Sequence, residues 1–363
     1  MGIVCCLLFV MVATSAWALS ICDYKSPETS LKDARLSFGY RYYDDAATPG
    51  TDVDSGQLTA DYDQLYDSPN YGFSISGSAE LVLTAFMPSG GSGQGAATFR
   101  YYPIEDSWLF AFGGLQASMA TGQLRPGVDV RFGGGIGRFS DVTPMAKAMH
   151  INDELMNMGA ITAQLSDEVL LAIASIIGRE IEYETVVDWV ADIEPLIEAD
   201  AGAELSARAT LTIEEIMLRS GDEQQCGWAL QVGIGYELMD PFGNPSNLVI
   251  AGSADAAFAP SADDQLMFHA SFSGPFAIMD ENTLSASLSY EYALSEDSTL
   301  FADYVLQRVQ PLGGAVSLSH AAGLAVGFDF AGADVLLQLS ISQNSSDPGW
   351  SLDLSVSAAM DLL

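Results

Sequence analysis

Apolar and polar residues alternate along most of the chain, and this period of two predicts β-strands. The segment 35–43 shows two opposed faces: Leu36, Phe38, Tyr40 and Tyr42 on one side, and Arg35, Ser37, Gly39 and Arg41 on the other. The segments 71–83, 228–238 and 284–292 repeat the pattern. Such segments match the roughly 9 to 11 residues of a tilted strand that crosses a bilayer.

Weaker copies of the alternation recur through both halves of the chain. They cover residues 56–65, 95–102, 108–119, 126–137, 248–258, 264–274, 299–308, 314–330, 334–342 and 350–363. Together the copies predict an all-β transmembrane antiparallel β-barrel of about 14 strands, with about 12 or about 16 as alternatives. A soluble secreted β-sandwich or solenoid would also alternate, but its aqueous face should carry charges that the apolar face here lacks.

The connections between these strands alternate in length. Loop-like segments follow the odd strands at 44–55, 84–94, 239–247 and 343–349, whereas 103–107 and 331–333 are tighter. Outer-membrane barrels place their short turns on the periplasmic side. This phase predicts that the interruption at residues 141–225 lies in the periplasm.

Residues 141–225 carry helical patterns and are strongly acidic. Thr143-Pro144 and Ser166 are start signals, and one helix is expected to run from Ser166 to Gly178. A second is expected over 185–199, and a capping-box pattern at Thr212 predicts the start of a third. The chain therefore divides into barrel halves at 19–140 and 226–363 around an α-helical insertion.

The N-terminus carries an export signal. An apolar run ends in Ala16-Trp17-Ala18, which suits signal peptidase and predicts a signal peptide over residues 1–18. Cleavage there leaves Cys22 and Cys226 in an oxidising compartment, where they are a candidate disulfide. The alternative is two separate small apolar side chains.

These features together resemble bacterial outer-membrane β-barrel proteins such as porins. The resemblance rests on the cleavable signal, the ten-residue alternating strands, the aromatic-rich apolar faces and the final strand that begins Trp350-Ser351-Leu352-Asp353. It covers about three quarters of the chain and implies the bacterial outer membrane, with outer-membrane lipid around the barrel. The helical insertion matches no subfamily.

Charge decides which solutes such a barrel favours. The net charge of −35 would repel phosphates, which excludes nucleic acid as a partner. Charges on the expected inner face are mixed but lean acidic: Arg35, Arg41, Glu80, Asp129, Arg131, Glu237, Glu291 and Asp303. In a water-filled pore they would weakly favour cations; the alternative is that they are solvated residues without a selective role.

Glycines lie on the inner faces of the strands that flank the insertion, at 133, 135, 137, 233 and 235. Backbone without side chains would let another element approach the wall, so part of the insertion could enter the lumen as a plug. The alternative is a separate periplasmic helical domain, since 169–177 and 186–197 can bury each other.

The sequence predicts no catalytic residue, cofactor or metal site. Three histidines are present, His150, His269 and His320, and only His269 shares an expected inner face with a serine, Ser271. The sequence therefore predicts a channel or transporter for small solutes. The alternative is an outer-membrane anchor whose helices bind a periplasmic protein.

Overall fold

The computed structural model describes residues 19–26, 28–43, 53–104, 107–219, 223–241, 247–276, 280–295, 298–330, 333–345 and 347–361. The chain forms two compact units. The barrel unit comprises residues 26–143, 220–259 and 263–363, and the helical unit comprises residues 1–25, 144–219 and 260–262. Among the described helices, none has the length and apolar character needed to cross a membrane.

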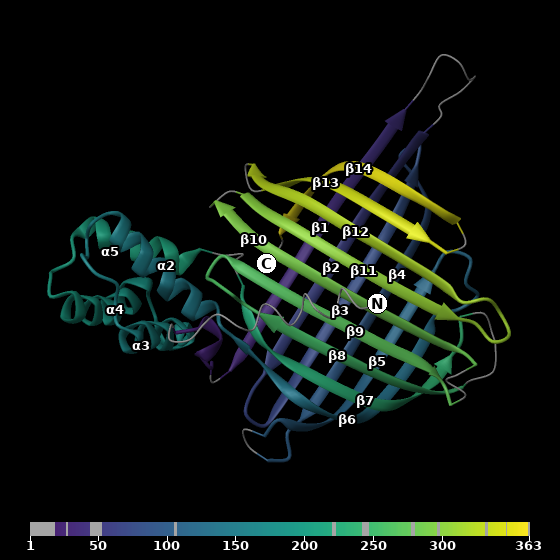
Figure 1. The fold of residues 1–363 in the computed structure, drawn as a ribbon, viewed down its shortest axis with the longest axis horizontal. Coiled ribbons are helices and arrows are strands. Elements are labelled where there is room, and N and C mark those ends of the chain that lie inside the picture. Colours follow the sequence, from purple (N-terminus) through teal and green to yellow (C-terminus); the bar gives the residue numbers. More distant parts are fainter. Residues whose placement is uncertain are drawn as a thin grey trace. The chain divides into compact units, whose positions relative to one another are not determined.

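The barrel unit is a closed antiparallel β-barrel (Figure 1). Its described strands number 14: β1 (Thr29–Tyr43), β2 (Val53–Asp67), β3 (Tyr71–Thr84), β4 (Met87–Tyr101), β5 (Leu109–Ala120), β6 (Gly127–Asp141), β7 (Gln225–Met239), β8 (Leu248–Phe258), β9 (Asp264–Pro275), β10 (Asn282–Ser295), β11 (Ser298–Gln310), β12 (Ser317–Phe330), β13 (Ala333–Asn344) and β14 (Asp347–Asp361). Each strand pairs with its neighbours in sequence, and β14 closes on β1. The predicted barrel of about 14 strands is confirmed.

Two connections are shorter than predicted. Residues 343–349 were expected to be loop-like, but β13 runs to Asn344 and β14 begins at Asp347. Residues 84–94 were expected to form a loop, but β3 runs to Thr84, β4 begins at Met87, and Ala85 and Phe86 make the turn alone. Both turn residues have positive φ, 51° and 59°, which suits the twist of a two-residue hairpin. The turn lacks the usual Asn-Gly signal, and the Gly- and Ser-rich start of β4 hides its alternation.

The polar face of the wall is the inner face of the barrel. Residues directly opposite each other across a strand pair share a face, so the register carries this assignment from strand to strand. On the polar face, contacts form between strands that are not neighbours: the Phe112 ring of β5 lies beside Gly233 of β7, and Thr29 of β1 accepts a 2.9 Å hydrogen bond from the backbone of Asp141 on β6. The contact between β1 and β6, which are far apart in the strand order, crosses the interior of the closed barrel and marks this face as the inner one.

The inner-face glycines of β6 and β7 accommodate aromatic rings of the barrel itself. A Cβ added at Gly133 would lie 2.6 Å from the Cα of Gly233 and 2.8 Å from the ring of Phe112. At Gly135 the added atom would meet the ring of Phe110. The space beside Gly133, Gly135 and Gly233 is therefore filled from β5, while Gly137 lies against the β7 backbone and Gly235 against Val249 and Arg131. Neighbours within the barrel thus remove the reason that the sequence offered for a plug.

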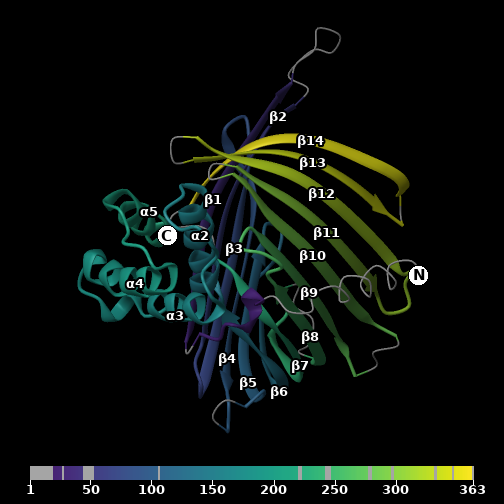
Figure 2. The same cartoon turned by 60° about the vertical axis from the view of Figure 1, so that its left-hand side comes forward.

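The helical unit has a core of its own. Its described helices are α2 (Thr143–Asn157), α3 (Asp167–Ile177), α4 (Val186–Ala201) and α5 (Ala207–Leu218), with short turns η1 (Ile21–Asp23) and η2 (Glu180–Glu182) (Figure 2). One apolar side of each helix is fully buried, including Ile151, Leu155, Ile173, Ile193, Ile197 and Ile213. The 11- and 16-residue helices α3 and α4 fall where the sequence placed them.

The third predicted helix start was wrong. Helix α5 begins at Ala207, and Ser206 caps it by accepting a 3.3 Å hydrogen bond from the backbone of Ala209. Thr212 lies inside the helix and donates to the Arg208 carbonyl at 3.1 Å. A threonine inside a helix can bond its hydroxyl to the carbonyl four residues earlier, so a Thr-x-Glu-Glu pattern does not by itself mark a helix start.

Candidate functional site: the inner wall of the barrel

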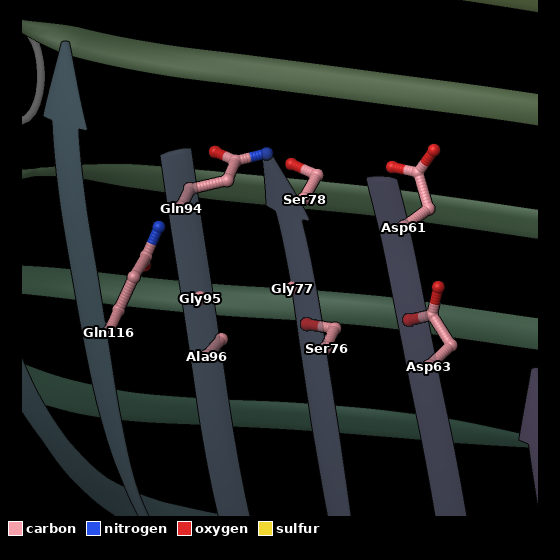
Figure 3. A pocket seen from close by; sticks show the side chains of 9 residues that line it. All are labelled: Asp61, Asp63, Ser76, Gly77, Ser78, Gln94, Gly95, Ala96 and Gln116. Carbon is pink, nitrogen blue, oxygen red and sulfur yellow. The ribbon is translucent and has the colours of Figure 1, made fainter. Parts of the chain in front are cut away.

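The inner wall carries a polar cavity of about 280 Å³ on β2–β5. Figure 3 shows its lining side chains on four adjacent strands. The lining residues are small or hydrogen-bonding: Asp61, Asp63, Ser76, Gly77, Ser78, Gln94, Gly95, Ala96 and Gln116. They come together because Asp63 lies opposite Ser76 and Asp61 opposite Ser78 in the β2–β3 register.

The register relates the charges singled out in the sequence to this cavity face. Arg35 lies opposite Asp61, Glu80 opposite Thr59, Asp129 opposite Gln116, Glu237 opposite Asp129, Arg131 opposite Gly114, Glu291 opposite Gln265, and Asp303 opposite Ser289. Arg41 lies opposite Ser55 along the backbone, and its side chain is outside the described residues. These charges are therefore distributed around the wall instead of converging on one point.

Sequence reasoning missed the acidic part of the wall. Asp33 lies opposite Asp63 and next to the Arg35–Asp61 pair, so three carboxylates and one guanidinium share this region. The signal was present, because Asp61 and Asp63 alternate with Ala60 and Tyr62. Asp33 lay outside the predicted strand, which was expected to begin two residues later.

A chain of hydrogen bonds crosses the inner faces of β7, β8 and β9. Gln231 donates its Nε2 hydrogen to Ser253 Oγ at 3.0 Å, and Ser253 donates to Asp255 Oδ2 at 3.0 Å. The other carboxylate oxygen, Asp255 Oδ1, lies 2.5 Å from His269 Nδ1. Asp255 therefore fixes the imidazole ring, and Gln231 and Ser253 fix the carboxylate.

Ser271, the serine that shares the inner face with His269, has a different partner. Its Oγ lies 2.7 Å from Ser285 Oγ on β10. Nucleophilic catalysis requires a hydroxyl within hydrogen-bonding reach of its base. The histidine–serine pair considered from the sequence is therefore not assembled by this geometry.

A buried polar cluster lies where β2 and β4 end. The Tyr102 hydroxyl donates to Asp67 Oδ2 at 2.9 Å, and the guanidinium of Arg138 lies 4.1 Å from the centre of the Tyr102 ring. Burial, together with the neighbouring Asp67 carboxylate, raises the pKa of Tyr102 to about 12. Arg100 lies over the Phe110 ring at 5.5 Å. The cluster joins side chains of β2, β4, β5 and β6 around Tyr102, which follows β4.

The outer wall is apolar and well exposed. Its large side chains include Phe99, Leu115, Phe132 and Val232, each at least half exposed. Aromatic pairs lie near the strand ends: Tyr66 with Tyr71 at 5.5 Å and Trp108 with Trp228 at 5.5 Å. Near another strand end, His320 stacks on Trp350 with ring centres 6.4 Å apart.

Cys22 and Cys226 are both disulfide-bonded. Among the described residues, no three His, Cys, Asp or Glu side chains are grouped in a way that could hold a metal ion. No donor set for a resident metal is therefore present in that part of the chain.

Comparisons with known proteins gave low-level structural matches only. No family model matches the chain, and no curated protein matches it. The monoaromatic hydrocarbon channel CymD is 11% identical, with 94% of this chain and 90% of that chain covered and a TM-score of 0.31. The Acinetobacter baumannii outer membrane protein Omp33 is 8% identical, with 93% of this chain and 100% of that chain covered and a TM-score of 0.33. The outer membrane channel DcaP of Acinetobacter baumannii is also 8% identical, with 93% of this chain and 98% of that chain covered and a TM-score of 0.35. At these scores the architecture rests on the strand order and register of this chain alone.

Proposed function

We propose that the chain is exported to a bacterial outer membrane, where its barrel is a channel for small polar solutes that weakly favours cations. The observation that carries this proposal is the two-sided wall: a closed ring of strands with an apolar outer face and a polar, acid-lined cavity inside. Apolar side chains facing lipid and polar side chains facing a lumen are the pattern of transmembrane barrels.

The outer face supports the membrane assignment. Aromatic residues gather in belts at membrane–water interfaces, because their rings are apolar and their N–H or O–H groups reach water. Tyr71 and Trp108 stand beside the β2–β3 and β4–β5 turns, and Trp350 stands near the β13–β14 turn, at the opposite ends of strands. Such a distribution is suited to a barrel held between two interfaces.

The inner face supports the preference for cations. Carboxylates on the wall of an aqueous pore raise the local concentration of cations within about 8 Å at physiological salt. Asp61 and Asp63 line the cavity directly, and Arg35 is the cation placed opposite one of them. The balance of this region is negative.

The test is the reversal potential of the purified protein in a planar bilayer under a tenfold KCl gradient, expressed as a K⁺/Cl⁻ permeability ratio. The wild type is expected to favour K⁺, and the Asp61→Asn, Asp63→Asn double variant is expected to move the ratio toward unity. Glu184→Gln, an exposed site in the helical unit, is the matched control and should leave the ratio unchanged. A wild type that favours Cl⁻, or a double variant with the wild-type ratio, contradicts the proposal.

The second candidate is an anchor whose helices bind a periplasmic protein. Its support is that the acidic helical unit buries a core of its own while exposing Val187 and Leu211, at 69% and 63%. Conductance with and without residues 144–222 separates the candidates, since backbone pairing continues through Val142 and Gln224 and a short turn can join the strands there. A wild type that never conducts, beside a deletion variant that does, would exclude an open channel.

A further inference from the structure

His269 is held in one orientation on the inner wall. Its Nδ1 lies 2.5 Å from Asp255 Oδ1, and the second oxygen of that carboxylate accepts from Ser253. A neutral imidazole carries one proton, and a carboxylate beside Nδ1 keeps the proton on that nitrogen. In the neutral form of His269 the lone pair therefore resides on Nε2.

Nε2 has no hydrogen-bond partner in the part of the chain that the structure describes. The side chain of His269 is 50% exposed, whereas that of Asp255 is 26% exposed, so the imidazole is the more exposed member of the pair. Around it stand neutral hydroxyls: Ser287 lies opposite His269 on β10, and Ser271 lies two residues along β9. The Nε2 atom of His269 is thus held in a fixed orientation at the edge of the lumen, where its lone pair can bind a ligand.

Histidines that bind metal ions commonly share this hydrogen-bonding arrangement. Metal-binding histidines donate their second ring N–H to a carboxylate, which fixes the tautomer and makes the ligating nitrogen more basic. Imidazole nitrogen suits Zn²⁺, Ni²⁺ and Cu²⁺, whereas Mg²⁺ and Ca²⁺ prefer oxygen ligands. The acidic wall supplies the field that draws divalent cations toward the site.

We propose that His269 is a transient ligand for first-row divalent transition-metal cations that cross the lumen. This inference rests on the proposed cation-favouring channel and names a class of solute for it. A single protein nitrogen, with water in the remaining coordination positions, holds such an ion weakly. Weak binding is what passage requires, because an ion must leave a pore site as readily as it enters. Asp255 is the positioning residue.

The first test is inhibition of K⁺ current by ZnCl₂ or NiCl₂ in planar bilayers. In the wild type the ions are expected to reduce the current in a saturable manner. His269→Gln should abolish the effect, and Asp255→Asn should weaken the apparent affinity by about 10-fold to 100-fold. His320→Gln, which removes the outer-wall histidine beside Trp350, is the matched control and should behave as wild type. Equal inhibition in His269→Gln, or none in the wild type, overturns the proposal.

A second readout keeps this proposal separate from conduction. Electron paramagnetic resonance of Cu²⁺ added to the detergent-solubilised protein should show coupling to one imidazole nitrogen that disappears in His269→Gln and persists in His320→Gln. Heat-modifiable gel migration verifies that each variant is folded. A protein that does not conduct but shows this signal refutes the channel and retains the site. A conducting protein without the signal refutes the site and retains the channel.

Discussion

The clearest structural prediction concerns Gly133 of β6, which lies close against the backbone of β7. An alanine Cβ at this position would lie 2.6 Å from the Cα of Gly233 and nearer still to the Val232 carbonyl oxygen. Both are backbone atoms, so no side-chain rotation relieves the overlap and the two strands must separate locally. Overpacking of this kind costs about 1 to 3 kcal/mol, and the backbone contact places Gly133→Ala at the upper end.

Gly39→Ala is the matched control. Gly39 occupies the same inner-face phase on β1, and an added Cβ there meets nothing within 4 Å. Reversible urea unfolding in lipid vesicles, followed by tryptophan fluorescence, should show a lower midpoint for Gly133→Ala and an unchanged midpoint for Gly39→Ala. About 3 kcal/mol corresponds to a folding constant lower by more than 100-fold. Equal midpoints for the two variants would refute the assigned β6–β7 packing.

Three further predictions follow from single contacts. Lys147 donates from Nζ to two carbonyls at the end of α5, each at 2.8 Å, so Lys147→Met should destabilise the helical unit by about 1.5 to 3 kcal/mol and lower its thermal midpoint by circular dichroism. Cys22 and Cys226 are expected to be bonded to each other; non-reducing peptide mapping should recover the linked pair, and two alkylated free thiols would contradict it. The hydrogen bond from the Tyr183 hydroxyl to Asp192 raises the pKa of Tyr183. The stability that this bond contributes is complete below the unfolded-state pKa of about 10 and is lost as the pH rises through the higher folded-state pKa. Urea unfolding of wild type and Tyr183→Phe should show the extra alkaline loss only in the wild type.

The sequence predicted the strands well because alternation is a local property. Strand β8 occupies residues 248–258 in both the prediction and the structure. Burial of one face fixes the phase of each strand, and that phase alone assigns a side chain to lipid or lumen. The start of β4, which is rich in Gly and Ser, was missed because small side chains carry almost no hydrophobic contrast.

The site needed information that alternation does not contain. Pairing between His269 and Asp255 depends on the β8–β9 register, which places two inner-face residues opposite each other; a shift of two residues would keep both inside and separate them. The inner-face glycines of β6 and β7 were identified from the sequence, but the aromatic rings that lie beside them were not. The rings of Phe112 and Phe110 lie there because the β5–β6 register places them opposite Gly133 and Gly135, and alternation within one strand does not fix that register.

The central claim is that one face of this wall contacts water and the other contacts lipid. Single cysteines at Ile75, Ser76, Gly77 and Ser78 of β3, introduced one at a time, test it directly in proteoliposomes. A charged, membrane-impermeant maleimide is expected to label the Ser76 and Ser78 positions and to spare the Ile75 and Gly77 positions. Gly77 borders the cavity with its backbone alone, and a side chain introduced there would share the outer face with Ile75. Equal labelling of all four positions would contradict a barrel that spans the membrane around an aqueous lumen.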